Sequence, residues 1–325
     1  MREKRLRFAG FEVAIATDSK RAQRIRKSPA YRYFLRPALN LLQRPASNGR
    51  HQGGRPDTRS RVTRGGDPAE LEGLLSPEAA AVARRVAEIE WYHTIDLPYG
   101  LKTPGFVDNR DEVHLYGLPE DMSGMRALDV GTFDGFWALE MERRGASVVA
   151  TDIGRWSDVD IPLRWREQDP AHLDVPTGAG FRLARELLQS KVERFETSVY
   201  DLSPEELGTF DVVVVSDLLQ HLRDPQRALE MVYSVTREDG CVIVAEVYNP
   251  DLEGFGEVAL SQFKAMVNHT WYVHSTATLK LMLNVAGFNP VDEVSRFPLR
   301  GGDCHVMAQK VTLKGYPWQR KIREN

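Results

Sequence analysis

Apolar and polar positions alternate in a regular order along residues 126–311 and predict strands and helices in turn. Short apolar runs predict strands, whereas apolar residues three and four apart predict helices. The expected strands are 126–130, 146–152, 195–200, 211–216, 240–247, 290–294 and 305–311. The expected helices are 136–144, 181–189, 225–235 and 279–285. Strands that alternate with helices in this way are typical of a doubly wound, mostly parallel α/β sheet.

Local signals support several of these elements. The run over 211–216 is rich in valine, as expected for a strand buried on both faces. Ser275 and Gly287 flank the last helix as its N-cap and its stop signal. Ser76 followed by Pro77 predicts an earlier helix over 79–90, since serine caps helices and proline suits their first turn.

Charge is divided unevenly along the chain. The chain holds 43 Lys and Arg and 46 Asp and Glu, of which residues 1–66 hold 17 and 4. The other residues therefore form an acidic body, with 26 basic side chains against 42 acidic ones. A basic arm on an acidic body can attract RNA or another anionic surface, or it can be a solvated tail. Both interpretations stay open.

Composition also divides the chain. Residues 44–66 are rich in Arg, Gly, Ser and Pro and predict a disordered linker, while apolar residues over 31–42 fit a helical hairpin broken at Pro37. We therefore expect a basic, partly disordered N-terminal extension over 1–66 and a helical segment over 67–119 that covers the active site. The α/β domain then occupies 120–325, with an insertion at about 250–274.

Several classes of protein are excluded. No apolar run reaches the ~18 residues of a transmembrane helix, and the N-terminus lacks the apolar core of a signal peptide. Cys241 and Cys304 are the only cysteines, which excludes a disulfide framework and a four-cysteine zinc site. No histidine pairs with cysteine at zinc-like spacing, so we expect no metal. We expect a cytoplasmic protein.

The stretch ALDVGTFDG, which begins at residue 127, is the most informative one. Asp129 ends a strand, and Gly131, Thr132 and Gly135 form the turn into the next helix, where glycines let the backbone approach a ligand. Asp152 ends the following strand, where a carboxylate can accept both hydroxyls of a ribose. The turn lacks the third glycine of a pyrophosphate-binding motif, which disfavours a dehydrogenase.

Two later features complete this pattern. Tyr200-Asp201 closes the third expected strand, where a carboxylate can accept the amino group of adenine, and Asp217-Leu218 follows the fourth. Together the motifs resemble the class I S-adenosylmethionine-dependent methyltransferases over about residues 120–312. The resemblance implies a seven-stranded, Rossmann-like sheet whose last strand is antiparallel, and S-adenosyl-L-methionine as cofactor. It implies these cofactor-binding residues: Asp129, Gly131, Thr132, Gly135, Asp152, Asp201, Asp217 and Leu218.

A narrower resemblance lies in two flanking segments. The segments WYHTIDLPYGLKTPG, from Trp91, and FKAMVNHTWYVHS, from Phe263, are similar to those of relatives of the tRNA wobble-uridine enzymes that alkylate 5-hydroxyuridine. Those enzymes use a carboxylated S-adenosylmethionine, held partly by a Tyr-His-Arg-Arg stretch. The matching window here is Gln220-His221-Leu222-Arg223, which lacks the tyrosine and one arginine. This departure disfavours carboxymethyl transfer.

Candidates for acceptor chemistry come from several places. His221 follows the fourth strand and has a pKa suited to base catalysis, although it can equally start a helix and bind a carbonyl. His93, the second catalytic candidate, lies with Trp91 ahead of the domain, where both can cover the cofactor or simply anchor the core. The remaining pocket candidates, each also compatible with packing, are Glu246, Trp271, Tyr272 and His274.

The function we expect is methyl transfer from S-adenosylmethionine to a hydroxyl on a small metabolite or sugar. The alternative is a tRNA wobble-uridine methyl or carboxymethyl transferase acting on 5-hydroxyuridine. A third possibility is a domain that binds the cofactor or RNA without turnover. The oligomeric state stays open.

Overall fold

The computed structural model describes residues 3–8, 11–16, 75–168, 173–255, 258–267, 269–298 and 309–318. The linker expected over 44–66 and the helical hairpin expected over 31–42 lie outside the described residues. Within the extension, β1 (Glu3–Phe8) and β2 (Phe11–Ala16) form an antiparallel hairpin that the apolar pattern did not predict. No helix in these described ranges is long and apolar enough to cross a bilayer.

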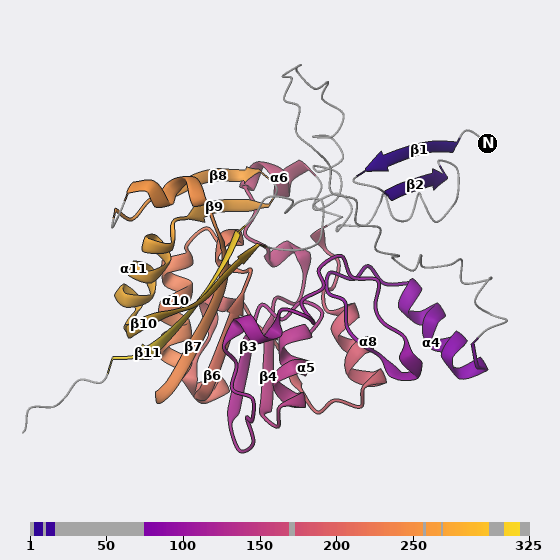
Figure 1. The fold of residues 1–325 in the computed structure, drawn as a ribbon, viewed down its shortest axis with the longest axis horizontal. Helices are drawn as coiled ribbons and strands as arrows, with labels where there is room; N and C mark the ends of the chain where they lie inside the picture. Colours follow the sequence, from indigo (N-terminus) through magenta and orange to yellow (C-terminus); the bar gives the residue numbers. More distant parts are fainter. Residues whose placement is uncertain are drawn as a thin grey trace, which may run out of the picture.

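A central sheet crosses the domain in the strand order β10-β11-β7-β6-β3-β4-β5 (Figure 1). Its strands are β3 (Arg126–Val130), β4 (Ser147–Asp152), β5 (Glu193–Glu196), β6 (Phe210–Ser216), β7 (Thr236–Tyr248), β10 (Phe288–Pro298) and β11 (Gln309–Pro317). The strands from β3 to β7 pair in parallel, whereas β11 runs antiparallel to both of its neighbours. The expected mostly parallel sheet with an antiparallel last strand is confirmed.

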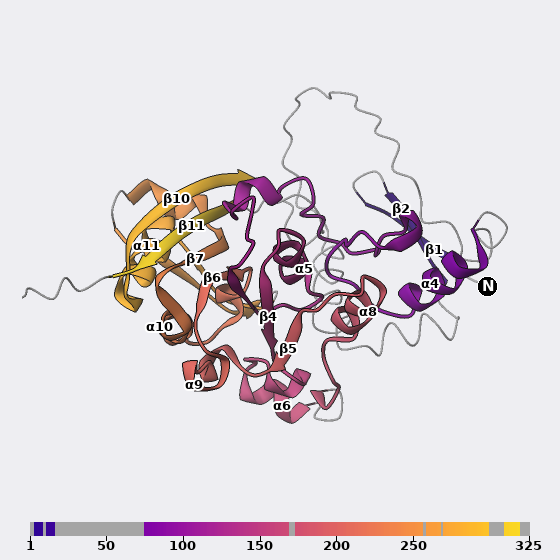
Figure 2. The same ribbon diagram turned by 90° about the horizontal axis from the view of Figure 1, so that it is seen from below.

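Helices cover both faces of this sheet. The helices of the described residues are α4 (Pro77–Ala87), α5 (Phe136–Arg143), α6 (Leu163–Gln168), α8 (Ala179–Leu187), α9 (Pro204–Leu207), α10 (Pro225–Val235) and α11 (Thr276–Ala286), of which α6 lies beyond the ends of the strands. Figure 2 shows α5 and α8 on one side of the strands and α9 and α10 on the other. Successive strand residues point to opposite faces. Ala127 therefore packs in the core with α4, α5 and α8, and Leu128 packs in the core with α10 and α11.

Some strands lie elsewhere than the apolar pattern predicted. The strand expected over 195–200 ends at Glu196, because Ser198 caps a short 3₁₀ helix, η5 (Val199–Asp201). Asp201 therefore ends a helical turn and does not close a strand. The strands expected over 240–247 and 290–294 extend to Thr236–Tyr248 and Phe288–Pro298.

The last strand, expected over 305–311, is observed at Gln309–Pro317, and residues 301–308 lie outside the described ones. Its position follows from pairing, since Gln309 to Gly315 lie opposite Tyr248 to Val242 of β7. Apolar periodicity within the strand itself cannot reveal which residues its neighbour will pair with.

The insertion forms η7 (Pro250–Phe255) and a hairpin of β8 (Ser261–Val267) and β9 (Thr270–His274), which stands near α6 in Figure 1. β9 joins the main sheet through the parallel pairing of His274 with Tyr248. Trp271 of β9 packs with Ile161 and Met266, and its indole N–H donates to the carbonyl of Asp160, 2.6 Å away. The insertion therefore covers the segment that follows β4.

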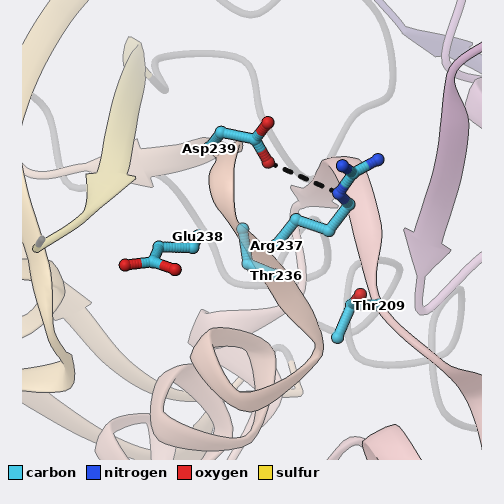
Figure 3. Close-up of a pocket in the computed structure, with 5 residues that line it drawn as sticks. All are labelled: Thr209, Thr236, Arg237, Glu238 and Asp239. Atoms are coloured by element: carbon cyan, nitrogen blue, oxygen red, sulfur yellow. Dashed lines mark ion pairs between the residues drawn. The ribbon is translucent and has the colours of Figure 1, made fainter.

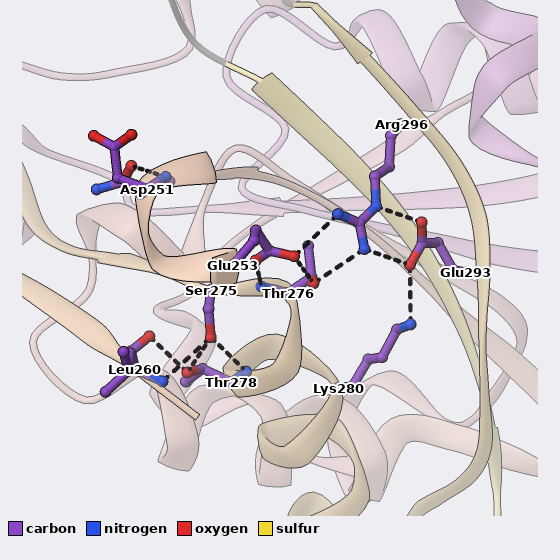
Figure 4. A network of polar contacts seen from close by, with 10 residues as sticks. Asp251, Glu253, Leu260, Ser275, Thr276, Thr278, Lys280, Glu293 and Arg296 are labelled. Carbon is purple, nitrogen blue, oxygen red and sulfur yellow. Dashed lines mark hydrogen bonds and ion pairs between the residues drawn. The ribbon is translucent and has the colours of Figure 1, made fainter. Parts of the chain in front are cut away.

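A polar network joins the insertion to α11 and β10 (Figure 4). Glu253 of η7 accepts a hydrogen bond from Arg296 of β10 at 3.0 Å. The hydroxyl oxygen of Ser275 accepts from the backbone N–H groups of Thr278 (3.1 Å) and Leu260 (3.2 Å). The predicted N-cap of α11 is confirmed, and the same serine also holds the chain that enters β8.

We expect Ser275→Ala to lower the free energy of unfolding by about 1–2 kcal/mol, measured by urea denaturation. The substitution removes the acceptor for two backbone N–H groups, one of which is the cap of α11. The control is Ser76→Ala, because Ser76 is an exposed N-cap that accepts from Ala79 alone. Equal losses in the two variants would contradict the double role of Ser275.

Candidate active site

The chain changes direction across the sheet between β3 and β6, because β4 and β5 lie on one side of β3 and β6 and β7 on the other. Ligands of open α/β sheets bind at the carboxyl ends of the strands at such a point. The turns that follow β3 and β6 meet here, since a Cβ added to Gly131 would lie 3.1 Å from the side chain of Leu218. The structure thus brings together two predicted parts of the cofactor site.

Both glycines of the turn after β3 have a backbone that L side chains rarely adopt. The φ angles are +74° at Gly131 and +91° at Gly135. A Cβ on Gly135 would also lie 2.6 Å from the ring of Phe181 in α8. A larger residue at either position would therefore disturb the turn.

Asp129 and Thr132 hold this turn from its buried side. The carboxylate of Asp129 accepts from the Thr132 hydroxyl at 2.7 Å and from the backbone N–H of Ala138 at 3.0 Å. Burial raises the pKa of Asp129 to about 7. Two of the predicted cofactor residues are thus engaged in shaping the turn and the start of α5.

Asp152 lies beside the glycine turn at the end of β4 and is partly exposed. Its two carboxylate oxygens accept from the backbone N–H groups of Phe133 (2.7 Å) and Ile153 (2.8 Å), and burial raises its pKa. A carboxylate oxygen has more than one acceptor site, so Asp152 can also accept ribose hydroxyls. A glycine cradle that any Cβ would fill, next to this carboxylate, fits the nucleoside of S-adenosylmethionine. Asp201 is exposed on η5, beyond β5.

A buried ionic cluster lies behind the turn that follows β6. Lys310 of β11 is 0% exposed, and its Nζ lies 2.6 Å from Asp217 Oδ2, 2.8 Å from Tyr116 Oη and 3.2 Å from Ser216 Oγ. Asp217 has a φ of +54°. Its second oxygen, Oδ1, is buried and has no hydrogen-bond partner in the part of the chain that the structure describes. Sequence reasoning missed Lys310 and Tyr116, because a lysine in a strand normally indicates an exposed position.

Glu246 lies next to this cluster and faces the backbone of the same turn. It is 1% exposed, and its Oε1 accepts from the N–H groups of Leu218 and Leu219, both at 2.8 Å. Burial, reinforced by Asp217, raises the pKa of Glu246 to about 8. The structure therefore gives this pocket candidate a role in shaping the turn, which continues into η6 (Leu219–His221).

The two catalytic candidates are both neutral imidazoles. His93 is buried and stacks on Phe136 with ring centres 5.5 Å apart, and burial lowers its pKa to about 3. Its Nδ1 has no hydrogen-bond partner among the described residues. His221 places Nδ1 2.9 Å from the carbonyl of His269, so Nδ1 carries the proton and Nε2 is the free acceptor. Burial also lowers the pKa of His221.

The aromatic candidates have different positions. Trp91 lies in the core, where its indole N–H donates to the carbonyl of Val86 at 3.0 Å, so the structure gives it a packing role. Tyr272 and His274 stack on each other along β9 with ring centres 5.9 Å apart. Trp271 contacts the chain that follows β6, since the guanidinium of Arg223 in that chain lies 5.0 Å from the centre of the Trp271 ring.

Asp160, which sequence reasoning also missed, joins the segments around the site. Its carboxylate accepts from the hydroxyl of Tyr200 at 2.6 Å and from the backbone N–H of Arg223 at 2.8 Å, while its carbonyl accepts from Trp271. It therefore links the chain after β4 to the chain after β5, to the chain after β6 and to the insertion. No local pattern in the sequence indicated this role of Asp160, since all these partners are distant in sequence.

A small open pocket lies at the other end of the sheet, at the amino ends of β6 and β7 (Figure 3). Its residues are Thr209, Thr236, Arg237, Glu238 and Asp239. Arg237 pairs with Asp211 at 2.6 Å and with Asp239 at 3.4 Å, so its charge is already compensated. Nowhere in the described ranges do three or more His, Cys, Asp or Glu side chains group as a metal site requires.

The sequence matches the family described as "Methyltransferase domain" over residues 105–293, more than half of the 325 residues. The chain belongs to the methyltransferase domain family. This membership agrees with the glycine turn, the sheet order and the carboxylate after β4. It confirms the prediction of a methyltransferase that uses S-adenosylmethionine as its cofactor.

Several known proteins are similar to this methyltransferase. The mitochondrial ubiquinone biosynthesis O-methyltransferase of Bos taurus is 25% identical over 162 residues, covering 49% of this chain and 39% of its own. The magnesium-protoporphyrin O-methyltransferase of Rhodobacter capsulatus is 36% identical over 118 residues, covering 36% of this chain and 43% of its own. The chain thus spans about two-fifths of the length of these relatives.

Among solved structures, the N-terminal domain of EvdMO1 in the presence of SAH and D-fucose superposes with a TM-score of 0.47. Its sequence is 17% identical, and the match covers 75% of this chain and 98% of that domain.

We expect the stability that Glu246 contributes to be lost as pH rises from about 4.5 to about 8, so that the melting temperature declines less over this range in Glu246→Gln. The folded protein holds a proton on Glu246 up to about pH 8, whereas the unfolded chain releases it near the ordinary value of 4.5. Stability contributed by this group is therefore lost as pH rises through that interval. The amide of the variant keeps an acceptor oxygen for Leu218 and Leu219.

The measurement is the melting temperature as a function of pH. Glu238→Gln, at an exposed position, serves as the matched control and should keep the wild-type slope. An unchanged slope in Glu246→Gln would show that another group is responsible.

Proposed function

We propose that this protein is an S-adenosylmethionine-dependent O-methyltransferase whose acceptor is a hydroxyl group on a neutral small molecule. The observation that carries the proposal is a pair of buried atoms without hydrogen-bond partners in the described chain, Asp217 Oδ1 and His93 Nδ1. Buried polar atoms are nearly always paired, so a ligand is the natural partner. A hydroxyl group both donates and accepts, and it therefore suits a carboxylate oxygen and an imidazole nitrogen together.

The charges around these atoms support a neutral acceptor. Lys310 compensates Asp217, the imidazoles of His93 and His221 are neutral, and burial keeps Glu246 protonated at neutral pH. A phosphate group would instead need an arginine or lysine that is available for pairing.

The residues present have clear roles in such a transfer. Asp152 and the glycine turn would hold the nucleoside of S-adenosylmethionine, which supplies an electrophilic methyl group when bound. Asp217 Oδ1 and His93 Nδ1 would orient the acceptor through one of its hydroxyl groups, and His221 Nε2 would accept the proton of the hydroxyl that takes the methyl group. Trp271 and the segment around Ile161 exclude water, and most of the rate in a displacement of this kind comes from positioning and desolvation.

The relatives and the sequence window support the same choice. By their names, both relatives are O-methyltransferases, and this supports an oxygen acceptor. The guanidinium of Arg223 donates to the carbonyl of Ile161 at 2.9 Å, so the arginine that remains of the wobble-enzyme motif is already engaged. This supports ordinary S-adenosylmethionine as the methyl donor.

The second candidate acceptor is 5-hydroxyuridine at the wobble position of tRNA. The observation in its favour is the basic extension, with 17 Lys and Arg against 4 Asp and Glu over residues 1–66. Such an arm can bind phosphates through counterion release, which makes the affinity fall steeply with salt.

The proposal is tested by transfer of a labelled methyl group from S-adenosylmethionine to a metabolite extract and, in parallel, to total RNA. We expect label in a small hydroxylated compound, and we expect His221→Ala to reduce turnover by about a hundredfold or more. The affinity of this variant for S-adenosylhomocysteine should stay unchanged. Label that enters tRNA alone would replace the proposal with the wobble-uridine function.

A separate measurement tests the cofactor site. Asp152→Ala removes the carboxylate beside the glycine turn, and charge-assisted hydrogen bonds of this kind are worth roughly 1.5–3 kcal/mol. Calorimetry should therefore show S-adenosylmethionine binding about tenfold or more weaker, while Asp239→Ala, at the far end of the sheet, leaves it unchanged. Wild-type affinity in a folded Asp152→Ala protein would remove Asp152 from the site.

A further inference from the structure

The glycine turn carries a carboxylate whose partners lie outside the turn. Asp134 is 3% exposed, and its Oδ2 accepts from the backbone N–H groups of Tyr92 (2.6 Å) and His93 (3.0 Å). Both residues belong to the segment over 91–107 that precedes β3, which we call the cover segment. One carboxylate oxygen thus joins the turn of the cofactor site to the backbone that carries His93.

Hydrogen bonds within the cover segment connect its residues to one another. The N–H of Thr94 donates to the carbonyl of Val107 at 2.8 Å, and the N–H of Val107 donates to the carbonyl of Tyr92 at 2.9 Å. The hydroxyl of Thr103 donates to the carbonyl of His93 at 2.6 Å. The two contacts with Asp134 therefore tie this internally bonded loop to the turn that precedes α5.

The other oxygen of Asp134 is enclosed by α8. A Cβ added to Gly180, in the first turn of that helix, would lie 2.4 Å from Asp134 Oδ1 and 3.2 Å from the ring of Trp91. Alanine is favoured over glycine within a helix by about 1 kcal/mol, so glycine at this place indicates that the space is needed. The carboxylate sits between α8 and the cover segment, with its acceptor oxygen directed at the latter.

Neighbouring residues of the turn face the two ends of the site. Phe133 donates its N–H to Asp152, the carboxylate beside the nucleoside position, at 2.7 Å. Asp134 accepts a hydrogen bond from the backbone N–H of His93. The ring of His93 stacks on Phe136, and the charges of Asp217 and Lys310 act on the pKa of this ring. A shift of this turn therefore reaches both the cofactor end and the acceptor end.

We propose that Asp134 is a positioning residue that fixes the cover segment to the cofactor turn and thereby sets His93 against Asp217. The inference rests on the proposed function, because it assumes that S-adenosylmethionine or its product binds at this turn. Asp134 itself contacts the backbone of the cover segment, and it acts on the reaction only through His93 and the turn.

Three variants separate the hydrogen bonds of Asp134 from its charge. Asp134→Asn keeps an acceptor oxygen for both N–H groups, and Asp134→Leu removes it. Gly180→Ala keeps the carboxylate but displaces it, whereas a Cβ on Gly254 would meet nothing within 4 Å, so Gly254→Ala is the matched control. Melting temperatures show which variants fold.

The first readout is calorimetry with S-adenosylhomocysteine. We expect binding about tenfold weaker in Asp134→Leu and several-fold weaker in Gly180→Ala. Asp134→Asn and Gly254→Ala should bind within about threefold of the wild type. This pattern of loss and rescue is not produced by a general loss of stability.

The second readout is trypsin cleavage after Lys102, which is exposed within the cover segment. S-adenosylhomocysteine should slow this cleavage in the wild type and in Asp134→Asn, and should have no effect on it in Asp134→Leu. If Asp134→Leu does not fold, the comparison of Gly180→Ala with Gly254→Ala makes the same test.

The outcomes distinguish a failure of the proposed function from a failure of the role of Asp134. A folded wild-type protein that does not bind S-adenosylhomocysteine would overturn the proposed function, and the role of Asp134 falls with it. Wild-type binding that Asp134→Leu and Gly180→Ala both retain would overturn the role of Asp134 alone. Equal losses in Asp134→Asn and Asp134→Leu would also overturn it, since the charge and not the hydrogen bond would then matter.

Discussion

The turn that follows β6, where we propose that the acceptor binds, depends on the buried ion pair of Lys310 and Asp217. Placing an ammonium group in a protein interior is costly unless it is paired and all of its protons have acceptors. Asp217, Tyr116 and Ser216 supply these acceptors to Lys310. Asp217, which pairs with this lysine, has a positive φ of +54°.

The Lys310–Asp217 pair also acts on the protonation of neighbouring groups. The charge of Asp217 reinforces the effect of burial on Glu246, so that this acid stays protonated and holds the N–H groups of Leu218 and Leu219. His93 stays neutral because burial outweighs the attraction of Asp217. The neutral imidazoles and the compensated charge of Asp217 support the proposed neutral acceptor.

Carboxylates around the glycine turn have separate tasks that their positions explain. Asp129 lies under the turn and holds its backbone, and Asp152 lies at its open side, where a nucleoside can reach it. Asp134 faces the cover segment. Burial raises the pKa of all three, to about 7 for Asp129 and for Asp134.

The sequence by itself determined the features that depend on a short stretch of chain. Alternating apolar runs predicted the parallel sheet, Gly131 and Gly135 predicted the turn after β3, and the cap Ser275 marked the start of α11. The tertiary structure alone decided which side chains meet. Lys310 reaches Asp217 and Tyr116 across 93 and 194 positions of the chain, and β11 lies where its pairing with β7 places it. Caps and periodicity arise from hydrogen bonds and burial within a few residues, whereas charge pairing in a core depends on which strands lie side by side in the folded sheet.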